Sequence, residues 1–263
     1  SLVLNYLIQN AIWWIEYADL DGFRVDTYNY ADPESIAIWT KAITDEYPDF
    51  NIVGEISMRE QAQISYWQKD SPVGKIQNFN SHLPSVMDFI FSDALLTIFN
   101  EDGNWETGMT RIYNNFTNDF LYSNVNNLLI FAENHDSHRL NQVYQNDIRK
   151  YKMAMTLLAT ARGIPQLYYG SEVGMAGNKD NGDADIRLDF PGGWQDDTIN
   201  AFTKEGRTAG QNDYFDFTSK LFNWRKNKSV VHFGKMTHYI PEDNTYVYFR
   251  HNTSESVMIL FNN

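Results

Sequence analysis

The stretch Gly22-Phe23-Arg24-Val25-Asp26 decides the fold expected for this chain. It is a short strand-like run that ends in a carboxylate. Asp32 and Pro33 follow as a predicted N-cap and first helical residue, and apolar residues then recur every three or four positions as far as Tyr47. A strand that leads into a helix is the repeating unit of a parallel sheet, so this stretch predicts an α/β fold.

The same alternation extends along the chain on both sides of this stretch. Upstream, the apolar spacing of residues 4–15 predicts a helix. Downstream, strands are expected at 51–56, 85–89, 128–132 and 164–169, and helices at 60–68, 90–99 and 147–161, the last capped by Gly163. A final helix should carry Tyr214, Phe217, Leu221 and Trp224. Together these elements predict five parallel strands.

The pattern changes near Val230. Residues 233–240, 246–251 and 256–261 are expected to form strands, and the turn-forming residues 242–244 separate the first two. Strands that follow one another so closely are typical of an antiparallel module. We therefore expect one domain over residues 1–229 and the start of a second over residues 230–263.

Composition and charge exclude several classes of protein. The chain has 34 acidic and 21 basic residues, a net charge of -13, and no cysteine. The acidic balance opposes binding to nucleic acid or to an anionic membrane, and the absence of cysteine excludes disulfides and thiolate metal sites. No apolar run is long enough to span a bilayer. The chain opens directly on a helical pattern without a signal peptide, and we expect a fragment of a longer protein.

Three of the expected strands finish in acidic residues. Asp26, Glu55 and Asp136 stand at or just beyond strand ends, with Arg24 and His135 beside them. The carboxyl ends of parallel strands lie on one face, so these groups are expected to converge on one cleft. A single acidic residue after a strand is more often a helix cap or a solvated loop residue. Three together, with an arginine and a histidine, indicate an active site.

These segments resemble a known family. Residues 22–26, 53–55 and 134–136 look like the second, third and fourth signature regions of the α-amylase family of glycoside hydrolases, in the same order. Residues 83–89, 163–170 and 189–194 resemble its cyclomaltodextrinase and neopullulanase branch. The resemblance implies a (β/α)8 barrel of which this chain holds about the last five β/α units, followed by an antiparallel β-sandwich domain truncated at its end.

The resemblance also implies roles for the acidic residues. Asp26 matches the nucleophile, Glu55 the general acid/base, and Asp136 the third carboxylate that grips the sugar ring. Arg24 lies two residues before Asp26 and should point to the same face of the strand, where it would keep that carboxylate ionised and aimed. His135 would hydrogen-bond sugar hydroxyls.

Two further residues are assigned to substrate binding on the same basis. Asn134 would shape the turn that presents the histidine. Tyr30 follows Asn29 where many amylases carry a Lys-His pair, a departure that fits the cyclomaltodextrinase-like branch.

The implied activity is retaining hydrolysis of α-1,4-glucosidic bonds in maltooligosaccharides, cyclodextrins or pullulan. Retention needs a charged nucleophile and a protonated acid whose carboxyl groups lie roughly 5–5.5 Å apart, with a covalent glycosyl-enzyme intermediate between the two steps. This chemistry needs no cofactor or metal. The acidic stretch 178–185 lacks the ligand spacing of an EF-hand, so it is expected to be a solvated turn rather than a calcium site. The expected partner is an α-glucan. The resemblance favours a periplasmic or extracellular location, and the oligomeric state stays open.

Two alternatives remain open. The first signature region and the first three barrel strands are not found, so the chain is alternatively a catalytically incomplete fragment that binds α-glucan. The His135-Asp136 pair also occurs in helical metal-dependent phosphohydrolases, but that family needs further ligands on helices, whereas this pair follows a strand.

The tryptophans divide into two groups. The helical spacing of Trp13, Trp14, Trp39 and Trp67 predicts that they pack in the core. Trp105 and Trp194 fall in expected loops, where an aromatic ring can stack on a sugar.

Overall fold

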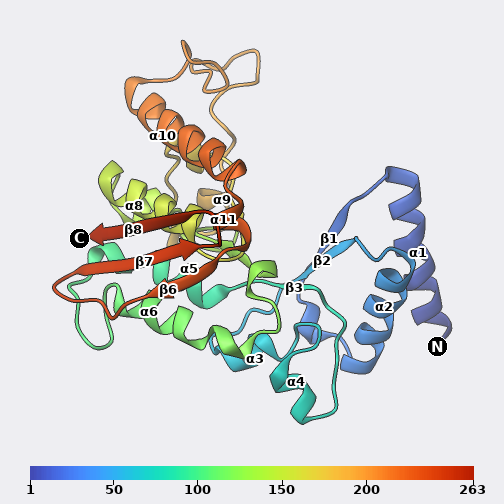
Figure 1. The fold of residues 1–263 in the computed structure, drawn as a ribbon. Coiled ribbons are helices and arrows are strands. Elements are labelled where there is room, and N and C mark those ends of the chain that lie inside the picture. The colour runs from blue at the N-terminus through green and yellow to red at the C-terminus, as the bar shows by residue number, and fades with distance from the viewer. The chain divides into compact units, whose positions relative to one another are not determined.

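A computed structural model describes residues 1–263 (Figure 1). The strands are β1 (Gly22–Val25), β2 (Asn51–Gly54), β3 (Ser85–Val86), β4 (Leu129–Phe131), β5 (Ile164–Gln166), β6 (Lys235–His238), β7 (Thr245–His251) and β8 (Ser256–Asn262). The helices are α1 (Leu2–Ala18), α2 (Pro33–Glu46), α3 (Gln61–Ser65), α4 (Pro72–Ile76), α5 (Phe89–Leu95), α6 (Thr110–Thr117), α7 (Leu140–Val143), α8 (Ile148–Thr160), α9 (Asp183–Ile186), α10 (Ala209–Lys226) and α11 (Ser229–Phe233).

The chain divides into two compact units. The first comprises residues 1–90 and 115–129, and the second comprises residues 91–114 and 130–263. Helix α5 and strand β4 each begin in the first unit and end in the second. No helix combines the length and the apolar character needed to cross a bilayer.

The first unit is built on a parallel sheet in the order β1-β2-β3. Gly22 pairs with Asn51 and Val53 with Ser85, so the predicted strands lie in register as neighbours. Helices α1 and α2 lie side by side next to β1 and β2 (Figure 1). The indole of Trp39 donates to the carbonyl of Leu7 at 3.3 Å, which fixes one helix against the other.

Helix α2 begins where the sequence predicts. The side chain of Asp32 accepts a hydrogen bond from the amide of Ser35 at 2.9 Å, and Pro33 occupies the first turn. Proline suits this position because its missing N–H would have no partner inside the helix. The loop from β1 is therefore fixed where it enters α2.

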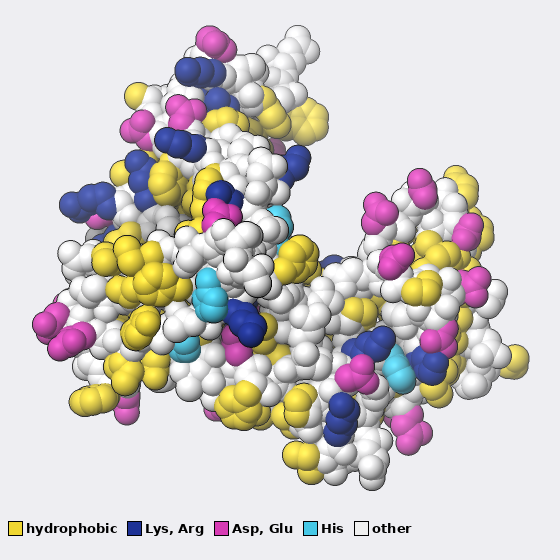
Figure 2. Space-filling view, viewed as in Figure 1, with side chains coloured by type: hydrophobic (Ala, Val, Ile, Leu, Met, Phe, Trp, Pro, Cys, Tyr) yellow, Lys and Arg dark blue, Asp and Glu magenta, His cyan; other side chains and the backbone are white.

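The second unit combines a two-stranded sheet, β4 and β5, with an antiparallel sheet in the order β6-β7-β8. Helices α8 and α10 pack against each other, and the hydroxyls of Tyr151 and Thr218 lie 2.8 Å apart between them. Alternate residues of β7 are buried, and Tyr248 reaches the hydroxyl of Thr160 on α8 at 2.5 Å. Hydrophobic side chains also gather on the outer surface over β6–β8 (Figure 2). The predicted antiparallel module is confirmed.

Several predicted elements have different bounds. The strands at 51–56, 85–89 and 164–169 end two or three residues earlier than predicted, because the backbone turns away as the loops that carry polar side chains begin. The helix predicted at 60–68 covers only α3, and the one at 90–99 ends as α5 at Leu95, followed by a 3-10 turn. The strand predicted from residue 233 starts at Lys235, since residue 233 ends α11.

Two other predictions are wrong. Ala161, not Gly163, caps α8, and its amide donates to the carbonyl of Leu157 at 2.9 Å. Trp13 and Trp14 are not core residues, because they are 50% and 45% exposed. Trp67, in contrast, is buried as predicted. The domain boundary near Val230 stays a prediction.

Candidate active site

Arg24, Asp26 and Glu55 come together at the carboxyl ends of β1 and β2. One guanidinium nitrogen of Arg24 lies 2.5 Å from Asp26 Oδ1, and the other lies 3.0 Å from Glu55 Oε1. The period of two along β1 puts Arg24 and Asp26 on the same side of the strand, as the sequence predicts. The hydrogen bond from Arg24 is the largest influence on Asp26 and holds the pKa of its carboxyl below the usual range. Asp26 is thus charged over the whole neutral range.

The two carboxylates differ in their surroundings. The Asp26 side chain is 69% exposed, whereas the Glu55 side chain is 9% exposed. The amide of Thr27 donates to Glu55 Oε2 at 2.9 Å, so both oxygens of Glu55 have a donor. One carboxylate is open to an incoming group and the other is fixed.

Thr27 is a residue that the sequence did not single out. Its φ of +44° lies in the left-handed region, which is uncommon for any residue except glycine and costs more for a β-branched one. The strained turn aims the Thr27 amide at Glu55, while the next amide, that of Tyr28, donates to the Glu55 carbonyl at 3.1 Å. With Thr27 in this conformation, two consecutive amides donate to Glu55, one to its side chain and one to its carbonyl.

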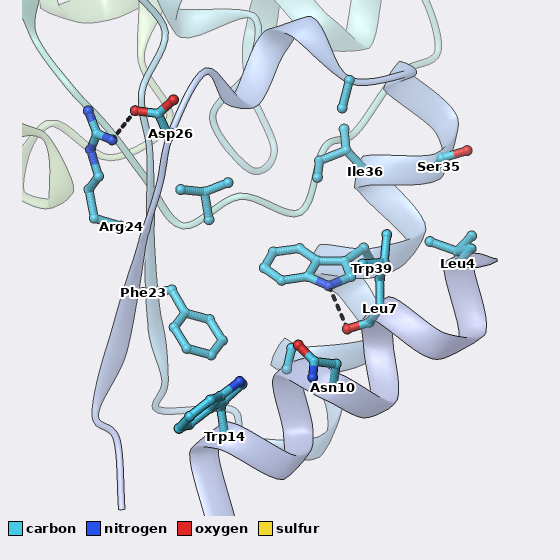
Figure 3. A pocket seen from close by; sticks show the side chains of 13 residues that line it. Leu4, Leu7, Asn10, Trp14, Phe23, Arg24, Asp26, Ser35, Ile36 and Trp39 are labelled. Carbon is cyan, nitrogen blue, oxygen red and sulfur yellow. Dashed lines mark hydrogen bonds and ion pairs between the residues drawn. The ribbon is translucent and has the colours of Figure 1, made fainter. Parts of the chain in front are cut away.

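An apolar groove of about 500 Å³ lies between β1 and the helices α1 and α2. Figure 3 shows Phe23 pointing toward Trp39 and Trp14, away from the side on which Arg24 meets Asp26. Arg24 and Asp26 nevertheless contribute to the lining of the groove, so the charged pair borders its aromatic wall. Tyr30, predicted to bind substrate, is exposed in the turn after β1. The structure shows no contact between Tyr30 and the carboxylates of Asp26 and Glu55.

A second cluster forms in the second unit around the turn Asn134-His135-Asp136. The side chain of Asn134 accepts a hydrogen bond from the amide of Asp136 at 2.9 Å, which shapes the turn as predicted. His135 Nε2 lies 3.2 Å from Asp136 Oδ2. Arg187 donates to the other oxygen of Asp136 at 2.7 Å and to the carbonyl of His135 at 2.8 Å. This arginine ties the turn to the loop that follows β5.

A buried ion pair supports the same turn from below. Glu133 and Arg139 lie 3.2 Å apart, and both are almost fully inaccessible to solvent. Glu133 also accepts hydrogen bonds from the hydroxyl of Ser171 and the amide of Leu140, while Arg139 donates to the carbonyl of Tyr169 at 2.7 Å. Burial is the largest influence on Glu133 and raises the pKa of its carboxyl. The pair links the end of β4 with the loop after β5.

The structure thus brings the predicted site residues together in two groups. Arg24, Asp26 and Glu55 form one group in the first unit. Asn134, His135 and Asp136 form the other in the second unit. The meeting of all three carboxylates at one cleft stays a prediction.

Sequence reasoning missed Arg187 and Arg139. Arg187 comes 51 residues after Asp136, and no periodicity connects a residue in one loop to a turn in another. Arg139 could have been identified from the sequence. It lies just beyond an expected strand that ends near Glu133, and a buried arginine and a buried glutamate each need a partner of opposite charge.

The acidic stretch 178–185 is internally paired. Asp185 accepts a hydrogen bond from the amide of Asn178 at 2.6 Å, and Asp183 pairs with Lys179 and with Arg187. The structure contains no group of three or more histidine or acidic residues arranged to hold a metal ion. His138, in the neighbouring loop, accepts a hydrogen bond from the Lys179 amide at 3.1 Å. That no cofactor is needed stays a prediction.

Comparison with known proteins gives consistent matches. The profile of the alpha-amylase catalytic domain matches residues 2–258. The cyclomaltodextrinase of Thermoanaerobacter pseudethanolicus is 24% identical over 99% of this chain and 40% of its own length. The intracellular maltogenic amylase of Bacillus subtilis is 28% identical over 68% of this chain and 28% of its own length.

Solved structures show the same fold. The alpha-amylase of Anoxybacillus superposes with a TM-score of 0.78 at 24% identity, over 99% of this chain and 52% of that one. The alpha-amylase of Geobacillus thermoleovorans, complexed with acarbose, superposes with a TM-score of 0.77 at 25% identity, over 98% of this chain and 52% of that one. The chain spans less than half the length of the curated relatives and about half the length of these solved structures.

Proposed function

The chain belongs to the alpha-amylase family, and we propose that it carries the nucleophile and the general acid/base of a retaining glycoside hydrolase. The substrates are α-1,4-linked glucans: maltooligosaccharides, cyclodextrins or pullulan. We assign β1–β5 to the last five strands of a (β/α)8 barrel and residues 230–263 to the start of a β-sandwich domain. One observation carries the proposal: a single guanidinium, that of Arg24, binds Asp26 and Glu55 at the ends of adjacent parallel strands.

The different surroundings of the two carboxylates support different roles for them in this proposal. Asp26 is exposed and held ionised by Arg24, which suits a nucleophile that attacks the anomeric carbon. Glu55 is buried and held in place by the Thr27 amide, and we assign to it the role of the acid that protonates the leaving oxygen and then, as a base, activates water. Sharing one guanidinium keeps the carboxyl groups close, compatible with the roughly 5–5.5 Å that retaining enzymes use.

Asp136 takes the third role in this proposal. Arg187 occupies one of its oxygens and His135 lies at the other, so the carboxylate has a fixed direction. A carboxylate aimed in this way can accept hydrogen bonds from two neighbouring sugar hydroxyls. Its contribution is greatest where those bonds strengthen in the transition state.

Trapping the covalent intermediate tests the assignment of the nucleophile. A 5-fluoro-α-glucosyl fluoride should label the protein once, and peptide mass spectrometry should locate the label on Asp26. Asp26→Asn should abolish labelling and lower maltoheptaose hydrolysis at least about a thousandfold, or ~4 kcal/mol in the barrier. Asp49→Asn, an exposed residue outside the site, should leave both unchanged. Normal hydrolysis by Asp26→Asn contradicts the proposal.

The alternative is a fragment that binds α-glucan without cleaving it. The first signature region and the first three barrel strands are not found in this sequence, which motivates this alternative. Calorimetry with maltoheptaose and a reducing-sugar assay on the same sample separate the two. Binding without release of reducing ends supports the fragment, and release of reducing ends that depends on Glu55 supports the hydrolase.

A further inference from the structure

A second hollow lies in the second unit, where the loop before α6 meets the turn between β6 and β7. Its volume is about 380 Å³, within the roughly 300–1,000 Å³ typical of small-molecule sites. Trp105, Tyr113 and Ile240 supply its aromatic and apolar walls, and Asn104, Glu242 and Asp243 supply its polar rim. The catalytic groups proposed above contribute nothing to its lining.

Trp105 is the unusual residue of this hollow. Its side chain is 89% exposed, although tryptophan gains more than most residues from burial. Nearby, Ile240 at the start of the β6–β7 turn is also exposed. Exposed aromatic and apolar groups that share one hollow mark a binding surface more often than scattered single residues do.

The loop that presents Trp105 is firmly held. The side chain of Asn104 accepts hydrogen bonds from the amides of Glu106 and Thr107 at 2.8 and 3.0 Å, and Thr110 donates to the Asn104 carbonyl at 2.6 Å. Across the hollow, Asn244 accepts from the Gly103 amide at 2.5 Å. Because both walls are fixed to each other, the aromatic side chain is presented without a large entropic cost on binding.

The charges of the hollow select the ligand. Two carboxylates, Glu242 and Asp243, stand on its rim, and no lysine or arginine lines it. Phosphorylated and other anionic ligands would be repelled. These features fit a neutral ligand that has an apolar face to stack on the indole and hydroxyls to bond with the amides and carboxylates. A pyranose ring has such a face and such hydroxyls.

We propose that this hollow is a second α-glucan-binding site, in which Trp105 stacks on a glucose ring and the rim accepts hydrogen bonds from its hydroxyls. The choice of glucan rests on the proposed function. The site holds a long chain to the protein and takes no part in cleavage.

Fluorine NMR tests the site directly. The chain has seven tryptophans, so incorporation of 5-fluorotryptophan should give seven resonances, and Trp105→Phe assigns one of them. Maltoheptaose should shift the Trp105 resonance in the protein. Trp105→Ala should weaken retardation in soluble-starch gels about tenfold, while Trp105→Phe should retain most of the affinity because the ring is kept. Phe120→Ala removes an aromatic residue that is exposed in the first unit and should bind like the parent.

The outcomes separate this site from the proposed function. Thermal unfolding should be unchanged in Trp105→Ala because the side chain is exposed, and maltotriose hydrolysis should be unchanged because the residue lies outside the proposed catalytic groups. A Trp105 resonance that saturating maltoheptaose does not move, with Trp105→Ala as tightly retarded as the parent, overturns the site whether or not the protein cleaves glucan. A moved resonance and weakened retardation without hydrolysis support the site and overturn the hydrolase. A resonance moved by a cationic peptide but not by maltoheptaose overturns the site.

Discussion

Arg24 serves the proposed site through geometry as well as charge. Its two terminal nitrogens bind different carboxylates, Asp26 and Glu55, at 2.5 and 3.0 Å. A planar guanidinium can do this in one fixed orientation, whereas the single ammonium of lysine cannot hold two acceptors in a defined direction. Replacement of Arg24 by lysine is therefore not conservative at this position.

Removing Arg24 should raise the pKa of Asp26. The pKa of the carboxyl is held below its usual range mainly by the hydrogen bond from Arg24, so Arg24→Gln should move this pKa back up toward that range. Carbon-13 NMR titration of the labelled carboxyl measures this without reference to activity. Asp32 is the internal control, because Ser35 rather than Arg24 lowers the pKa of its carboxyl. A titration of Asp26 that the substitution leaves in place would show that Arg24 does not bind it in solution.

Gly54 provides a second test beside the site. A Cβ at this position would lie 2.6 Å from Leu83 Cδ2 and 3.0 Å from Tyr28 Cγ, closer than the packed side chains allow. Gly54→Ala should lower the free energy of unfolding by about 1–3 kcal/mol, measured by urea denaturation, because the buried contacts must shift. Gly210→Ala is the matched control, since a Cβ there would meet no atom within 4 Å and α10 gains helix propensity. Equal stability of the two variants would contradict the packing of Tyr28 against β2.

The elements show what the sequence can predict. Helix α2 was predicted from Asp32 and Pro33, because a cap depends on residues only three positions apart. Strand ends were predicted less well, since β2 and β5 stop where tertiary contacts turn the backbone. The short helix α4 was missed for a related reason, because five residues carry too little periodicity to reveal it.

Helix α10 is closed at its start by a capping box. Thr208 accepts from the amide of Gln211 at 3.2 Å, and the Gln211 side chain accepts from the Thr208 amide at 2.9 Å. Thr208→Ala should cost about 1 kcal/mol in the free energy of unfolding, and Thr208→Asn should restore most of it because asparagine also caps. Lys220→Ala, exposed on the same helix, should change stability by less than about 0.5 kcal/mol. Urea denaturation that finds both alanine variants alike would show that the box adds nothing.

At the scale of the whole molecule, the candidate site was predicted only in part. The acidic strand ends and Arg24 follow from a local rule, the alternation of side chains along a strand. Arg187 could not be predicted, because it reaches Asp136 from a loop that no periodic pattern constrains. Nor does any local rule predict the distance between Asp26 and Asp136, because this distance depends on how many strands lie between the two residues in the fold.

The exposed edge of the sheet in the first unit should allow the chain to self-associate. Strand β1 is the edge strand of its sheet, and the apolar groove beside it is lined by Leu7, Trp14 and Trp39 among others. An edge with an adjoining apolar face is a template for pairing, and a second copy is the partner present when this chain is alone in solution. The net charge of -13 opposes that pairing. Because 0.1 M salt largely screens the repulsion between exposed charges more than about 10 Å apart, association should strengthen as salt is raised.

Sedimentation velocity at low and high salt measures this association. The 263-residue chain should shift from monomer toward larger species as its concentration and the salt rise. Leu7→Lys places a charge in the groove and should keep the chain monomeric at both salt concentrations. Leu260→Lys, which changes an exposed apolar residue on β8 in the second unit, should associate like the parent. If Leu260→Lys suppresses association as strongly as Leu7→Lys, the contact is not at the groove.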